Sequence, residues 1–139
     1  MRQLDDPEVA AWIAKANGDL RMARLAASDA EPLFDQACFH AQQSAEKALK
    51  SLIVAFDLVP PRTHDLSVLL GVIFPVLRGV EELEVHVEVL SEYSVGPRYP
   101  SFLAGETAEE AAAAIAAAAA VLEWIVLQIR LDGSTGSAI

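Results

Sequence analysis

The chain has 139 residues, which is the length of one domain with its own hydrophobic core. Hydrophobic residues make up 53% and charged residues 22%, which excludes a disordered chain, while abundant Ala and Leu with only 6% aromatics favour helices over sheets. The formal net charge of -10 at pH 7 argues against nucleic-acid binding through a broad basic surface. We therefore predict a single all-α domain.

The first predicted helix covers residues 7–28. Asp6 stands at the N-cap position, Pro7 at the first helical position and Glu8 beside the positive end of the helix dipole. One apolar stripe then recurs at spacings of three and four, formed by Val9, Trp12, Ile13, Ala16, Leu20 and Ala23. The segment 29–32 ends this helix.

The second predicted helix covers residues 33–56 and separates cleanly into two arcs at 100° per residue. The apolar arc contains Ala41, Ala45, Ala48, Leu49, Leu52 and Phe56. The opposite arc contains His40, Gln43, Lys47 and Lys50, flanked by Gln42 and Glu46.

Two further helices follow a connection that Pro60 and Pro61 stiffen, and the first of them is shorter than the others. The third covers residues 66–74 and has Thr63 and Asp65 as candidate N-caps. The fourth covers residues 80–95, with one apolar and one acidic face, and is expected to stop at Gly96 and Pro97.

The last predicted helix covers residues 107–131. Thr107 and Glu110 form a capping box at its start, and Gly133 is placed to close it in a left-handed conformation. We expect residues 1–131 to form one domain and residues 132–139 a flexible tail. Short loops between four long helices and one shorter helix predict an antiparallel up-and-down four- or five-helix bundle.

The Ala-rich segment 111–129 is long enough to cross a membrane. It carries Glu123, and Ala contributes little to membrane insertion, so we interpret it as a buried helix and predict no membrane partner. Cys38 is the single cysteine, so no internal disulfide forms, and no signal peptide opens the chain. These features predict a cytoplasmic protein.

The polar arc of the second helix is the first candidate site, because its members lie three and four residues apart on one strip of surface. One interpretation is the solvent-facing side of a bundle helix, with Glu46 and Lys50 in an i,i+4 pair worth about 0.3 to 0.5 kcal/mol. The other is a ligand-binding face. Composition alone favours the first.

Arg62 and His64, just before the third helix, suit phosphate binding or acid/base work near a helix N-terminus. The alternative is structural: Asp65 caps the helix, His64 packs, and Arg62 pairs with a neighbouring carboxylate. Because capping residues are common, the structural interpretation is favoured for this segment.

The loop 94–106 contains Arg98 and Tyr99, and Tyr93 precedes it. Two rings and a guanidinium suit stacking on a base and holding a phosphate. Packing of Tyr99 and a carboxylate partner for Arg98 explain the pattern equally well.

Neither a metal site nor a cofactor is predicted, because the three His and one Cys lack ligand spacing. Cys38 lies on the apolar side of its helix and is interpreted as a small core residue rather than a nucleophile.

Taken together, ACFHAQQSAEKALKSLIVAFDLVPPRTHDLSVLL and YSVGPRYPSF resemble the HEPN family over about residues 6–130. The run FHAQQSAEKALK followed by PRTHDL is similar to the small stand-alone prokaryotic members. The resemblance implies a helical-bundle homodimer that acts with a minimal nucleotidyltransferase, as in toxin and antitoxin pairs. It also implies a shared polar groove lined by His40, Gln42, Gln43, Glu46, Lys47, Arg62, His64, Asp65, Arg98 and Tyr99.

Ribonuclease members of the broader family carry an Arg followed by His after four to six intervening residues. Here Arg62 reaches His64 after one residue and Arg78 reaches His86 after seven, so that motif is missing. We therefore predict a non-catalytic module that binds a nucleotide or other phosphate-bearing ligand. The alternatives are an endoribonuclease toxin that uses Arg62 and His64, with RNA as its substrate, and a purely structural dimerisation module.

Overall fold

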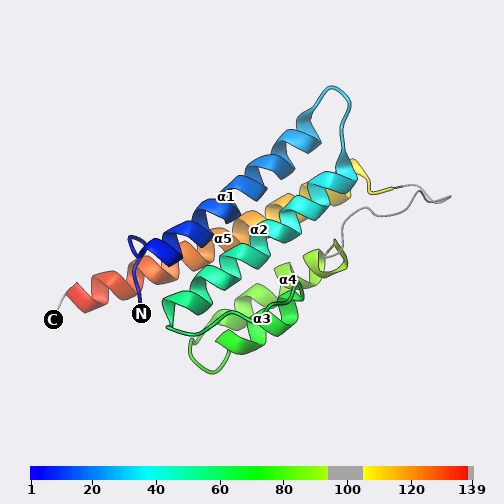
Figure 1. Cartoon of the computed structure of the whole chain (residues 1–139). Coiled ribbons are helices and arrows are strands. Elements are labelled where there is room, and N and C mark those ends of the chain that lie inside the picture. Colours follow the sequence, from blue (N-terminus) through cyan, green and yellow to red (C-terminus); the bar gives the residue numbers. More distant parts are fainter. Residues whose placement is uncertain (94–104, 138–139) are drawn as a thin grey trace.

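The computed structural model describes residues 1–93 and 105–137, with side chains through residue 133. Every regular element in these ranges is helical, which confirms the all-α prediction. The three long helices are α1 (Pro7–Ser28), α2 (Phe34–Ala55) and α5 (Ala108–Ser137), and the two short ones are α3 (Leu66–Ile73) and α4 (Glu84–Leu90). Figure 1 shows the long helices as the body of the bundle, with α3 and α4 beside it.

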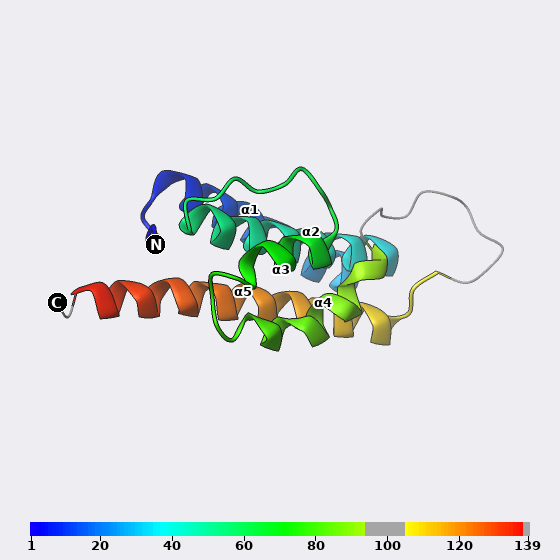
Figure 2. The same ribbon diagram turned by 90° about the horizontal axis from the view of Figure 1, so that it is seen from below.

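Helix α2 lies at the centre: α1 and α5 pack along it, α3 covers a further side, and α4 packs mainly on α5. The connection between α2 and α3 runs back along the bundle (Figures 1 and 2). As a result α2, α3 and α5 point one way, while α1 and α4 point the other way. This return path brings the residues before α3 alongside the middle of α2.

Three predicted helix starts are confirmed by hydrogen bonds. The Asp6 carboxylate accepts from the backbone N–H groups of Glu8 and Val9, at 3.1 and 3.2 Å. Asp65 caps α3 in the same way. Thr107 and Glu110 form the reciprocal capping box of α5, with both distances 3.1 Å. Side-chain acceptors thus satisfy the free N–H groups that begin these helices.

Other boundaries differ from the prediction. Residues 80–93 do not form one α-helix: 3₁₀ turns at Val80–Leu83 and Ser91–Tyr93 flank α4. The described part of the chain therefore has three long α-helices and two short ones. The predicted stop at Gly96 and Pro97 lies outside the described residues.

Helix α5 also passes Gly133 and continues to Ser137, so its expected end near residue 131 is wrong. The N-terminal segment packs there: the Asp132 carboxylate accepts from the Gln3 amide at 3.1 Å and lies 3.8 Å from the N-terminal ammonium. These contacts support the last turns of the helix against fraying.

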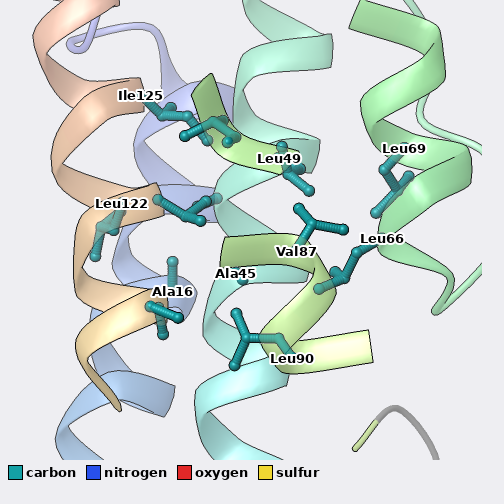
Figure 3. Close-up of a cluster of buried hydrophobic side chains, with 14 of the residues drawn as sticks. Ala16, Ala45, Leu49, Leu66, Leu69, Val87, Leu90, Leu122 and Ile125 are labelled. Carbon is teal, nitrogen blue, oxygen red and sulfur yellow. The ribbon is translucent and has the colours of Figure 1, made fainter. Parts of the chain in front are cut away.

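The core lies where α2 faces α5, α3 and α4. Figure 3 shows Leu49, Leu66, Val87 and Ile125 directed into it from these four helices. Helix α5 is long and apolar enough to cross a membrane by length and composition alone, yet only 39% of its apolar window is buried. The buried residues of α5 recur at spacings of three and four from Ala111 to Ile129, so the expected burial holds for one face of the helix.

Candidate functional site

The polar arc of α2 does not face solvent, because α1 and the returning connection before α3 cover it. Gln42 is fully buried, and the relative exposures of Glu46 and Lys50 are 3% and 9%. His40 and Lys47 are partly buried, with about a quarter of each side chain exposed. The interpretation of this arc as the solvent-facing side of the helix is wrong, since α1 and the connection before α3 both pack on it.

The first polar cluster joins α1 to α2 around Asp19. One carboxylate oxygen of Asp19 lies 3.0 Å from Nδ1 of His40, and the other accepts a hydrogen bond from the Lys47 ammonium. Nearby, the buried Ser44 hydroxyl donates to the backbone carbonyl of Ala16 at 2.7 Å. A partly buried carboxylate between two basic side chains fastens the two helices together.

The second cluster surrounds Glu46 and joins α2 to the connection before α3. Glu46 accepts from the Lys50 ammonium at 3.1 Å and from Nδ1 of His64 at 2.8 Å. Gln42 donates to the backbone carbonyl of His64 at 2.9 Å. The Lys50 ammonium also lies 5.6 Å from the ring centroid of Trp12, within cation–π distance. Among the described residues, no buried side-chain N or O atom lacks a hydrogen bond.

His64 is the exposed member of this cluster. Its side chain is 70% exposed, whereas the Glu46 carboxylate that holds it is 4% exposed. An ionised carboxylate only accepts, so in the neutral imidazole this hydrogen bond places the ring hydrogen on Nδ1 and leaves Nε2 as an acceptor. Arg62 is exposed two residues earlier and makes no hydrogen bond or ion pair to any residue that the structure describes. The expectation that His64 packs and that Arg62 pairs with a carboxylate is therefore wrong: His64 is largely exposed, and Arg62 has no carboxylate partner among the described residues.

The remaining predicted site residues divide into three groups. Gln43 donates to the Gln42 side chain at 2.8 Å and so belongs to the polar arc. Asp65 serves as the N-cap of α3. Arg98 and Tyr99 lie outside the described residues, so their half of the predicted groove stays a prediction.

Tyr93 is a core residue and not an open stacking platform. It is buried, and burial together with the neighbouring Cys38 raises the pKa of the Tyr93 phenol. Burial also raises the pKa of the Cys38 thiol to about 11, which keeps it protonated at neutral pH. The prediction that Cys38 is a structural residue fits this environment.

Sequence reasoning missed Asp19, the centre of the first cluster. A signal was present, because Asp19 falls between Ala16 and Ala23 on the apolar stripe that α1 buries. A carboxylate on such a stripe indicates a basic partner on the facing helix. The part of the chain that the structure describes holds no group of three His, Cys, Asp or Glu arranged to bind a metal.

The fold and its polar interior define a small helical-bundle domain in which partly buried ion pairs of Asp19 join α1 to α2. The family model of the HEPN domain matches residues 9–129, so the chain belongs to the HEPN domain family.

Two solved structures are similar to it. ST0689, an archaeal HEPN homologue, is 29% identical with a TM-score of 0.67, and the match covers 93% of this chain and 99% of that one. TT1696 from Thermus thermophilus is 28% identical with a TM-score of 0.71, covering 89% of this chain and 99% of that one. No curated protein sequence matches the chain.

Proposed function

We propose that this protein is a HEPN-domain module that binds a nucleotide or another phosphate-bearing ligand through the segment Arg62–Asp65. One observation carries the proposal: a buried carboxylate, Glu46, orients the exposed imidazole of His64, which follows the exposed Arg62 by two residues. A guanidinium suits phosphate oxygens, and an imidazole fixed through Nδ1 presents Nε2 to a ligand.

This geometry moves the proposed site away from the polar arc of α2. His40 and Lys47 are engaged by Asp19, and Lys50 is engaged by Glu46, so these positive charges are already neutralised within the chain. A ligand phosphate would have to displace those carboxylates. In this proposal the arc positions His64 through Glu46 and Gln42 and does not itself contact the ligand.

The proposed module acts as a homodimer in the cytoplasm, together with a minimal nucleotidyltransferase in a toxin–antitoxin-like pair. Membership of the HEPN family and the sequence resemblance to its small prokaryotic members support this part of the proposal. Co-purification of the full chain with the nucleotidyltransferase encoded beside it would test the partnership, and a neighbourhood without such a gene would contradict it.

Calorimetric titration of the full chain with ATP, GTP and UTP tests the binding site. We expect saturable heat with at least one nucleotide, and Arg62→Ala should weaken that binding about tenfold or more through the loss of a charge-assisted contact. Arg78→Ala is the matched control, because it removes another exposed guanidinium beyond the far end of α3. Absence of heat with all three nucleotides, alone or with the partner, would contradict the proposal.

A second candidate function is RNA cleavage, favoured by the same Glu46–His64 pair. Nε2 of His64 would take the proton of a ribose 2′-hydroxyl, and Arg62 would stabilise the phosphate charge that develops. Expression should then arrest growth, and His64→Ala should abolish both the arrest and RNA cleavage, whereas His86→Ala in α4 should not. Equal growth of wild type and His64→Ala without RNA cleavage would exclude this function.

A further inference from the structure

A groove of about 770 Å³ runs between α1 and α5. These two helices touch each other much less than either touches α2, so part of the apolar surface of each stays uncovered. The apolar lining includes Ile13, Ala14, Leu20, Leu122, Val126 and Leu127. An open groove lined in this way is typical of an interaction surface.

The α5 side of the groove carries exposed apolar surface. The window from Ala108 to Gly133 has a mean hydropathy of 2.0, and most of it is not buried within the chain. Leu127 alone is 50% exposed. Covering this face removes apolar surface from water, which is the main favourable term in protein association.

Three charged side chains also line the groove: Arg24 from α1, and Glu123 and Arg130 from α5. All three are exposed, and none makes a hydrogen bond or ion pair with another residue in the described ranges. A face that carries both signs of charge, with no ion pair among these side chains, can pair with a copy of itself, because each charge can meet its opposite on the second copy.

The spacing on α5 fixes how two copies would meet. Glu123, Leu127 and Arg130 stand at i, i+4 and i+7, so they lie on one face of the helix. In an antiparallel pair of α5 helices centred between Val126 and Leu127, each Glu123 faces Arg130 of the second copy. The two-fold axis then passes through the apolar centre, with one ion pair on either side.

The distribution of charge favours this groove over the exposed face of α4. Two copies with a net charge of -10 repel each other, and the exposed face of α4 with its flanking turns carries Glu81, Glu82, Glu84, Glu88 and Glu92. The groove instead combines two arginines with one glutamate. Approach through this face brings opposite charges together where approach through α4 would not.

We infer that a second copy of this chain covers the groove, forming an antiparallel α5–α5 pair with reciprocal Glu123–Arg130 contacts. The inference rests on the homodimer proposed above and assigns the surface that forms it.

Sedimentation equilibrium of the full chain tests this assignment. We expect a dimer for wild type, and the charge reversals Glu123→Arg and Arg130→Glu should each raise its dissociation constant about tenfold or more. The double variant, with both reversals, should recover the dimer because opposite charges face each other again. Glu81→Arg and Arg78→Glu are matched controls on exposed residues outside the groove, and circular dichroism verifies that each variant is folded.

A disulfide provides an independent test of the register. In a Cys38→Ala background, Leu127→Cys should form an intermolecular disulfide on mild oxidation, because the axis brings the two positions together. Val85→Cys, an exposed position on α4, should remain a monomer on a non-reducing gel.

The outcomes separate this inference from the proposed function. A dimer that every α5 variant leaves intact would keep the proposed homodimer and overturn this interface alone. A monomeric wild type would overturn both, and binding of that monomer to neutral phosphatidylcholine vesicles would identify a bilayer as the occupant of the groove. Ligand binding at Arg62 and His64 is measured separately, and its outcome changes neither the test of the homodimer nor the test of the interface.

Discussion

At the scale of single residues, Asp19 and Glu46 determine what the basic side chains of α2 do. Each carboxylate lies between two basic groups, Asp19 with His40 and Lys47, and Glu46 with Lys50 and His64. Buried ions are stable only when their partners are in place. Most of the polar residues of α2 therefore hold segments together, and His64, in the connection before α3, is the most exposed of their ion-pair partners.

The Glu46–Lys50 pair should behave as one unit. Glu46→Gln is expected to lower the free energy of unfolding by about 3 kcal/mol, because it leaves the buried Lys50 ammonium without its counterion. Glu46→Gln combined with Lys50→Met should cost less than the sum of the two single changes. Urea unfolding measures all three variants, with the exposed Asp5→Asn as the control; additive losses would show that the pair is not coupled.

At the scale of elements, helix starts follow from local sequence, whereas helix ends and faces depend on neighbours. The caps at Asp6, Asp65 and Thr107 were predicted because each uses atoms within three residues of the cap. The end of α5 was not predicted, because it depends on contacts that Gln3 and the N-terminal ammonium make with Asp132. The favoured interpretation of the polar arc of α2 as solvent-facing was wrong, because a helical wheel shows which residues share a side, not whether that side is covered.

The capping box of α5 should contribute measurably to stability. Thr107→Ala is expected to lower the free energy of unfolding by about 1 kcal/mol, because the Glu110 N–H loses its side-chain acceptor. Thr107→Ser keeps the hydroxyl and should stay within about 0.5 kcal/mol of wild type. Equal urea midpoints for the Ala and Ser variants would contradict the role of the hydroxyl.

At the scale of the whole molecule, contacts between distant segments set both the site and its stability. The start of α2 meets the segment before α5 where the Glu106 backbone N–H donates to the Asp35 carboxylate at 2.8 Å. A side-chain hydrogen bond with Asp35, together with burial, raises the pKa of Glu106. The folded state therefore favours the protonated form of Glu106 more than the unfolded state does.

This contact predicts a pH dependence of stability. Because the folded-state pKa of Glu106 lies above its unfolded-state value, its stabilising contribution is fully present below about pH 4 and is lost as the pH rises through the folded-state pKa. Glu106→Gln should flatten that part of the curve of unfolding free energy against pH. Glu109→Gln, an exposed change in the first turn of α5, is the control; identical curves for wild type and Glu106→Gln would contradict the prediction.

The sequence by itself determined the helical class, the approximate positions of the long helices and three of the N-caps, because periodicity and capping act over a few neighbouring residues. It also grouped the polar residues of α2 with PRTHDL. Only the tertiary structure decided that the connection before α3 returns along α2, which buries Glu46 and leaves His64 exposed above it. The physical reason is that burial and ion pairing depend on which distant segments come to lie side by side, and no local pattern in one chain specifies that.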